Sequence, residues 1–364
     1  MNIAELDTPA LLIDLDIMDR NLGRMAEYTR THNFRLRPHT KTHKIPSLAE
    51  RQIGLGAAGL TVAKVGEAEV MMKAKPPELL VAFPVIGKQK LDRLMTVAKT
   101  TRVTVSLDSL TAAAQLSAAA QAAAQTIGVL VEIDAGLGRV GVHPGPDLLS
   151  LVQALASLPG LSFEGIAFYP GHIKVLDEAA DTALAAVGTL LDGIVRDLEA
   201  AGFPVKIVSG GSTPTLYRSH QVARMNEIRP GTYIFNDRNT VLCGATTYED
   251  CAASILATVV STAVKGQMII DGGSKTFSSD RSMGSEEVSF GRLLDAPEAV
   301  FGKMNEEHGF VDIRKVSKSF QVGDRIRVLP NHVCVAMNLH EQVYGYRGET
   351  VEQVWRVEGR GKLQ

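Results

Sequence analysis

Between Phe34 and Asp237 the chain alternates short apolar runs, rich in β-branched residues, with longer segments of helical periodicity. The runs include "FRLRPHT", "GLTVAK", "RVTVSLDS", "GVLVEIDAG" and "EIRPGTYIFND", and the helical segments include "DTALAAVGTLLDGIVRDLEAAG". Strands that alternate with helical patterns are typical of parallel β/α folds. Roughly eight such units over about 200 residues predict a (β/α)8 barrel. An open, doubly wound sheet is the alternative that the pattern leaves open.

The pattern changes after Asp237. The segments "SILATVVSTAVKGQMIIDGG", "DRIRVLPNHVCVAMNL" and "EQVYGYRGETVEQVWRVEGRG" are strand-rich, contain glycine turns and show no long helical pattern. The opening segment "PALLIDLD" also has the pattern of a strand, and we assign it to the same β-rich domain. A single core rarely exceeds about 250–300 residues, so two domains are expected. We predict a barrel over residues 17–237 and a β-rich domain over residues 1–16 and 238–364.

Composition limits the classes of partner. The 38 basic and 40 acidic residues give a net charge of −2, which provides no electrostatic surface for nucleic acid or an acidic membrane. No apolar run reaches the roughly 18 residues of a membrane span, and the start lacks the pattern of a secretory signal. The three cysteines are too few and too scattered for a disulfide framework. We therefore expect a cytoplasmic protein that acts on a small molecule.

Polar residues follow the predicted barrel strands, where catalytic residues gather in this fold. Lys41, Arg139 and Tyr169 lie at three of these strand ends. The last two predicted barrel strands end in the glycine-rich turns "SGGST" (residues 209–213) and "RPGTY" (residues 229–233). Backbone N–H groups of such turns can hold a phosphate. A lysine, an arginine, a tyrosine and such turns together suit an anionic aromatic cofactor.

Lys41 lies in the basic segment "RPHTKTHK". Neighbouring cations and desolvation make a lysine a better nucleophile, because they favour its neutral amine. The expected cationic neighbours are Arg37, His39, His43 and Lys44. An exposed, solvated lysine is the competing interpretation, and Lys64 is the second candidate for the nucleophile.

His332 and Cys334 form the candidate metal site. They lie two residues apart in "PNHVCVAMNLH", and on a β-strand this spacing places both side chains on one face. An imidazole and a thiolate suit a divalent metal, most naturally zinc. A half-buried strand with an apolar cysteine would explain the same pattern.

These segments together resemble the D-threonine aldolase and D-serine dehydratase family. The resemblance rests on "DTPALLIDLD", "RPHTKTHK", "VEIDAGLGRVGV", "FYPGH", "SGGST", "IRPGTYIFND", "IDGGSKTF", "EEHG" and "PNHVCVAMNLHEQVYG", which occur in this order from Asp7 onward. Members of that family are fold-type III pyridoxal-phosphate enzymes, with an alanine-racemase-like barrel and a β domain. The "PH-x-K-x-HK" and "H-x-C" segments are the most specific, whereas the glycine turns are generic.

The resemblance implies a role for each candidate residue. Lys41 would join the cofactor covalently, Arg139 would lie near its phenolic oxygen, and Tyr169 near its ring nitrogen. His332 and Cys334 would bind zinc, manganese or magnesium beside the β-hydroxyl of a D-amino acid, and the enzyme would be a homodimer. The residues implied to hold the cofactor's phosphate are Gly211, Ser212, Thr213, Gly231 and Tyr233.

Two activities remain open within this resemblance. D-Threonine aldolases of the family commonly show His-x-Asp where this chain has His332 and Cys334, and His-x-Cys is similar to the zinc-dependent dehydratases. We expect retro-aldol cleavage of a D-β-hydroxy amino acid to glycine and an aldehyde. Dehydration of D-serine or D-3-hydroxyaspartate to an oxo acid and ammonia is the alternative, and amino-acid racemisation is a more distant one.

Overall fold

The structure, a computed structural model, describes residues 1–283 and 288–364. The chain divides into two compact units. One unit contains Met1–Arg24 and Thr232–Arg360, and the other contains Met25–Gly231 and Gly361–Gln364. We call the first the β unit and the second the barrel unit.

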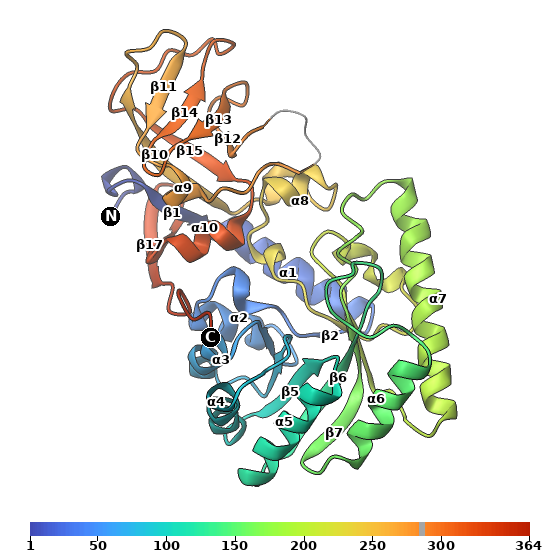
Figure 1. The fold of residues 1–364 in the computed structure, drawn as a ribbon. Helices are drawn as coiled ribbons and strands as arrows, with labels where there is room; N and C mark the ends of the chain where they lie inside the picture. Colours follow the sequence, from blue (N-terminus) through green and yellow to red (C-terminus); the bar gives the residue numbers. More distant parts are fainter. Residues whose placement is uncertain (284–287) are drawn as a thin grey trace. The chain divides into compact units, whose positions relative to one another are not determined.

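The barrel unit contains eight parallel strands, coloured blue to yellow in Figure 1, in the order β2-β9-β8-β7-β6-β5-β4-β3. Hydrogen bonds from Ala58 N to Leu36 O (2.8 Å) and from Thr61 N to Pro38 O (2.9 Å) join the two ends of this order, so the sheet closes on itself. The predicted (β/α)8 barrel is confirmed. The strands are β2 (Arg35–Leu36), β3 (Leu60–Val62), β4 (Glu78–Val81), β5 (Arg102–Leu107), β6 (Ile127–Ile133), β7 (Leu161–Phe168), β8 (Ile207–Gly210) and β9 (Glu227–Ile228).

Helices follow the barrel strands and begin at recognisable signals. Pro46 and Pro146 occupy the first turns of α2 and α6, where a missing N–H costs nothing. Ser109 and Asp177 cap α5 and α7 through their side chains. In the part of the chain that the structure describes, no helix has both the length and the hydropathy needed to cross a bilayer. The helices are α1 (Leu15–Thr31), α2 (Pro46–Gly54), α3 (Val65–Met71), α4 (Lys88–Ala98), α5 (Leu110–Ala122), α6 (Pro146–Ser157) and α7 (Glu178–Ala200).

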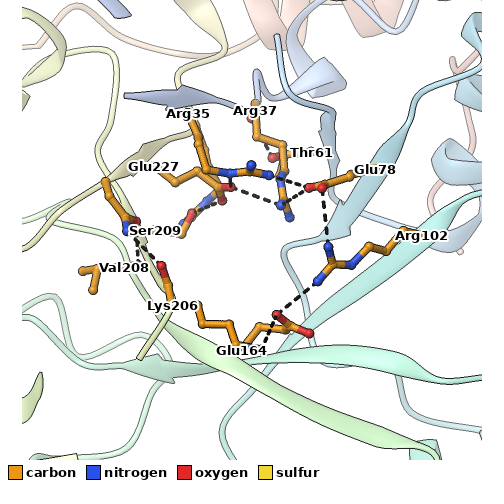
Figure 2. Close-up of polar contacts among 12 residues, drawn as sticks. Arg35, Arg37, Thr61, Glu78, Arg102, Glu164, Lys206, Val208, Ser209 and Glu227 are labelled. Atoms are coloured by element: carbon orange, nitrogen blue, oxygen red, sulfur yellow. Dashed lines mark hydrogen bonds and ion pairs between the residues drawn. The ribbon is translucent and has the colours of Figure 1, made fainter. Parts of the chain in front are cut away.

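Charged side chains, most of them on or near the first residues of the barrel strands, form one ion-pair network (Figure 2). Arg37, directly after β2, is 1% exposed and lies 2.8 Å from Glu78 and 3.1 Å from the fully buried Glu227. Arg102 contacts both Glu78 (3.6 Å) and Glu164 (3.1 Å). The network therefore joins strands that are not neighbours in the sheet. In this fold, catalytic residues usually lie at the opposite, carboxyl ends of the strands.

The β unit is built on a nine-stranded sheet. Its strand β1 (Ala10–Asp14) pairs antiparallel with β10 (Ala253–Ser261) and parallel with β16 (Gln342–Arg347), so the beginning of the chain lies between two late strands. Leu11, Leu12 and Ile13 are fully buried in this position. The remaining elements are β11 (Gln267–Ile270), β12 (Gly291–Leu293), β13 (Val300–Met304), β14 (Gly309–Asp312), β15 (Arg325–Pro330), β17 (Thr350–Arg356), α8 (Arg238–Leu242), α9 (Ser274–Phe277) and α10 (Val333–Leu339).

The strand predicted around the candidate metal ligands is wrong. Strand β15 ends at Pro330, His332 is the residue that precedes helix α10, and Cys334 is the second residue of that helix. The Asp237 carboxylate accepts a hydrogen bond from Val333 N (3.0 Å), which stabilises the start of the helix. This contact comes from a distant segment and outweighs the strand preference of Val333 and Val335.

Candidate active site

Lys41 lies in a one-turn 3-10 helix, Thr40–Thr42, that follows β2. The turn begins at His39, whose ring nitrogen Nδ1 accepts a hydrogen bond from Lys41 N (3.4 Å). Thr40, Thr42 and His43 are fully buried, whereas the side chain of Lys41 is exposed. The fold therefore anchors the turn through its other residues and presents the lysine amine at the carboxyl end of the barrel.

Glu67 lies next to the lysine turn, and sequence reasoning missed it. Its carboxylate is 1% exposed and accepts hydrogen bonds from Thr40 Oγ1 (3.1 Å) and Ala63 N (2.9 Å). Burial raises the pKa of Glu67, while the charges of Lys44 and Lys41 lower it. The only sequence signal was an acidic residue in the first turn of the helix after β3. A buried carboxylate bonded to Thr40 fixes the residue adjacent to Lys41.

The expected cationic surroundings of Lys41 differ from those observed. His43 is not a cation, because its burial lowers its pKa to about 4. Its Nδ1 accepts a hydrogen bond from Ile45 N (3.0 Å), and Nε2 lies 3.3 Å from Gln52 Oε1. Burial, followed by the charge of Lys41, also holds the pKa of His39 well below its usual range. Arg37 is paired with carboxylates in the network at the other end of the strands.

The charge of the predicted neighbour Lys44 acts on Glu67 beside the lysine turn, and two arginines add further positive charge. The charges of both Arg229 and Arg139 reach the ring of His39 and lower its pKa. Arg229 is buried and donates hydrogen bonds to Ser209 Oγ (2.6 Å) and to the Phe168 carbonyl (3.1 Å). The sequence placed Arg229 beside a glycine turn but gave it no role, because its partners come from two other strands. The result is a cationic region around the lysine turn.

Arg139 and Tyr169 come together as neighbours on the loops after β6 and β7. The Arg139 guanidinium carbon lies 4.8 Å from the centre of the Tyr169 ring, within cation–π range. Two carboxylates fix the arginine's loop: Asp134 accepts hydrogen bonds from Gly136 N and Gly138 N, and Asp108 accepts one from Gly141 N, all at 3.0 Å. The pair predicted at the cofactor's ring is therefore assembled on one side of the barrel's carboxyl end.

The two glycine-rich turns need their glycines. Gly211 has φ +85°, a conformation that favours glycine, and the adjacent Ser212 and Thr213 are buried. A Cβ atom on Gly231 would lie 2.6 Å from Thr42 Oγ1 and 3.0 Å from the His39 carbonyl oxygen. The turn after β9 is thus packed directly against the lysine turn. Tyr233, the remaining residue predicted at the phosphate, is buried and belongs to the β unit.

These residues fit an anionic aromatic cofactor such as pyridoxal phosphate. The barrel unit combines an exposed lysine with two arginine charges, and two glycine turns allow a ligand to approach the backbone closely. Arg139 and Tyr169 offer planar groups to an aromatic ring. The donor set is cationic and neutral, so the phosphate and phenolic oxygens of such a cofactor would find partners of complementary charge.

His332 and Cys334 are in contact within the β unit. The charge of Cys334 is the largest cause that raises the pKa of His332 to about 11, and burial opposes it. A side-chain hydrogen bond joins the two residues, so their donor atoms face each other. A nitrogen and a sulfur donor fit a borderline-soft cation such as zinc. Among the described residues, no group of three or more His, Cys, Asp or Glu side chains converges on one point.

Two family models match the chain. "Alanine racemase, N-terminal domain" covers residues 13–239, and "Putative serine dehydratase domain" covers residues 252–346. Among curated proteins, 3-hydroxy-D-aspartate aldolase of Paracoccus denitrificans (strain Pd 1222) is 33% identical over 100% of this chain and 94% of its own.

Solved structures agree with these matches. D-Threonine aldolase from Filomicrobium marinum superposes with a TM-score of 0.92 and 33% identity, over 99% of this chain and 98% of its own. D-threo-3-Hydroxyaspartate dehydratase from Delftia sp. HT23 superposes with a TM-score of 0.86 and 30% sequence identity, over 98% of both chains. Solved variants of D-threo-3-hydroxyaspartate dehydratase include a metal-free form with a cysteine replaced by alanine, and a form with a histidine two positions earlier replaced by alanine.

Proposed function

The chain belongs to the D-threonine aldolase and D-serine dehydratase family of fold-type III pyridoxal-phosphate enzymes, and we propose that it cleaves D-β-hydroxy amino acids to glycine and an aldehyde. The observation that carries this proposal is the likeness to a D-threonine aldolase along 99% of the chain. We assign the amine of this chemistry to Lys41, which lies on a turn whose other residues are buried. Its side chain is exposed, which the competing interpretation of a solvated lysine also expects.

We assign the cofactor-binding roles as follows. Lys41 joins the cofactor covalently, Arg139 binds its phenolic oxygen and Tyr169 lies by its ring nitrogen. Gly211, Ser212, Thr213, Gly231 and Tyr233 hold the phosphate. The support is the cationic region around the lysine turn and the two glycine turns, one of which packs against that turn. His332 and Cys334 bind the divalent metal.

The reaction follows from what each part contributes. When bound, pyridoxal phosphate supplies an electron sink for charge at the substrate's Cα, and the metal supplies a Lewis acid for its β-oxygen. In the cleavage the β-hydroxyl loses its proton, the Cα–Cβ bond breaks, and Cα gains a proton. Lys41 provides the amine that exchanges with the substrate's amine, and Arg139 and Tyr169 orient the reacting groups.

A product assay tests the function. Full-length protein supplied with pyridoxal phosphate and zinc or manganese is incubated with D-threonine, D-serine and D-3-hydroxyaspartate, and each product is quantified. We expect glycine with an aldehyde, and none from L-threonine or from a Lys41→Ala variant. If no D-β-hydroxy acid yields an aldehyde, the aldolase proposal is wrong.

Dehydration is the second candidate function, and Cys334 favours it. The related dehydratase has a histidine and a cysteine at the same spacing, and its cysteine variant was solved in a metal-free form. In a dehydration Cα loses a proton to Lys41 and Cβ loses hydroxide, which together amount to one water molecule. The enamine that remains tautomerises to an imine, which water hydrolyses to an oxo acid and ammonia. The same assay would then show pyruvate from D-serine, without an aldehyde from D-threonine.

We also propose that the protein is a cytoplasmic homodimer. Three free cysteines suit a reducing compartment. Phe83, Ile86, Val140 and Val175 are large apolar residues on loops after β4, β6 and β7, and each is 39–45% exposed. A second copy of the chain would cover such side chains. Light scattering should give about twice the 39.1 kDa mass of one chain.

A further inference from the structure

We propose that Asp237 is the positioning residue of the metal site, and that its carboxylate orients His332 so that Nε2 is the nitrogen left for the metal. The inference rests on the proposed function, because it takes His332 and Cys334 as the metal ligands. Asp237 lies far from both in the sequence, at the start of α8, and no sequence pattern singled it out.

Protein groups contact both oxygens of the Asp237 carboxylate. It is fully buried, and its Oδ2 lies 3.2 Å from His332 Nδ1 and accepts a hydrogen bond from Val333 N (3.0 Å). Its Oδ1 accepts a hydrogen bond from Thr240 N (2.9 Å). The Asp237 backbone N–H in turn donates to Thr240 Oγ1 (2.8 Å). The carboxylate therefore cannot rotate away from the imidazole without losing bonds at both helix starts.

This geometry selects one tautomer of His332 in its neutral form, which is the form that can bind a metal. A neutral imidazole has a single N–H, and an Nδ1–H that donates to Asp237 leaves the lone pair on Nε2. Metal-bound histidines commonly donate their second N–H to a carboxylate, which fixes the ring and increases its basicity. Asp237 has the position and the charge for that role.

The same carboxylate also determines where Cys334 lies. Through Val333 N it stabilises the first turn of α10, in which Cys334 is the second residue. Thr232 Oγ1 lies 3.6 Å from Cys334 Sγ. One buried side chain thus orients the imidazole and sets the backbone from which the thiol projects. The loss of that side chain should weaken both ligands together.

Zinc affinity of the Asp237→Asn variant tests the inference. If the amide oxygen keeps its bond to Thr240 N, the amide NH2 faces His332 Nδ1 and favours the tautomer with the proton on Nε2. We expect zinc to bind roughly 10–100-fold more weakly than in the wild type. The measurement is a competition between the full-length, cofactor-loaded protein and a chromogenic chelator, so it does not depend on turnover.

Thr240→Ala is the matched control. It removes the hydroxyl that accepts from Asp237 N but leaves the contacts of Asp237 with His332 and Val333. A purely structural role for the Asp237–Thr240 cap predicts that both variants melt earlier with unchanged zinc affinity. The positioning role predicts that only Asp237→Asn loses affinity. Wild-type affinity in a folded Asp237→Asn protein would overturn the inference.

Two further results separate the possible failures. If the wild type itself binds no zinc in the competition assay, the metal part of the proposed function is wrong, and this inference is wrong with it. If Asp237→Asn does not fold, the ¹⁵N spectrum of the His332 ring in zinc-loaded wild type decides. We expect a protonated Nδ1 and a zinc-bound Nε2, and zinc on Nδ1 would contradict the proposal.

Discussion

Lys41 stands out from the other residues of its turn because it alone is exposed while the residues on both sides are buried. Reduction with borohydride should therefore trap pyridoxal phosphate on wild type and not on Lys41→Ala, as measured by intact mass and a peptide map. Lys64→Ala is the control, because the Lys64 amine already lies 3.6 Å from the centre of the Phe83 ring. Trapping on Lys64, or undiminished trapping in Lys41→Ala, would show that the wrong lysine has been chosen.

His43 makes a second prediction, about stability and pH. Its pKa is about 4 in the folded protein, against a usual value of 6.5, so the unfolded chain takes up the proton first as the pH falls. The stability it contributes is complete above pH 6.5 and is lost as the pH falls to about 4. The size of the effect is about 3 kcal/mol.

Urea unfolding at several pH values checks this sign. His43→Asn keeps an acceptor for Ile45 N but cannot titrate, so its free energy of unfolding should depend less on pH than that of the wild type between pH 6.5 and 4. Parallel pH dependences for the two proteins would mean that His43 is not buried in its neutral form.

At the residue scale, the sequence predicted where Lys41 lies along the fold but not which side chains surround it. Lys41 could be proposed as the nucleophile because a strand end followed by a basic segment is visible in one stretch of chain. The charges that act on the turn come from Arg139 and Arg229, more than 90 residues away, and a buried Glu67 fixes Thr40. Such contacts depend on the closure of the barrel, which a linear pattern does not contain.

At the scale of elements, apolar runs located all eight barrel strands but overestimated two of them. The run that begins at Phe34 and the run that begins at Glu227 each contain only two paired residues, Arg35–Leu36 and Glu227–Ile228. The first ends where the chain turns into the Lys41 helix, and the second ends before Pro230. The barrel therefore closes through a short ladder of backbone hydrogen bonds. Its stability there depends more on the surrounding side chains.

Arg37 should be one of those side chains. It is 1% exposed and neutralises Glu227, which is fully buried beside the short β2–β9 ladder (Figure 2). Arg37→Met would leave that carboxylate without its closest cation, at a cost of about 3–5 kcal/mol. Arg102→Met is the control from the same network, and because Arg102 is 55% exposed it should cost less than about 1 kcal/mol. Equal unfolding free energies for the two variants would contradict this account.

The candidate metal ligands show why spacing alone misled. His332 and Cys334 were predicted on one face of a strand, yet they meet because one precedes a helix and the other lies in its first turn. The two side chains are in contact as predicted, but the predicted strand is wrong, and the metal role of the pair stays a prediction. The deciding contact, from Asp237 to Val333 N, joins segments nearly a hundred residues apart.

For the whole molecule, the question is whether the metal serves chemistry or folding. The backbone around both candidate ligands is fixed by protein hydrogen bonds, from Val333 N to Asp237 and from Ala336 N to the His332 carbonyl (3.3 Å). Zinc sites that hold a fold together usually have four protein ligands, whereas this pair leaves positions for substrate and water. Chelation should therefore reduce turnover at least roughly tenfold while the far-UV circular dichroism stays unchanged. Added zinc should restore the rate, and a metal-free protein that keeps its full rate, or one that unfolds on chelation, would show that the pair does not serve catalysis.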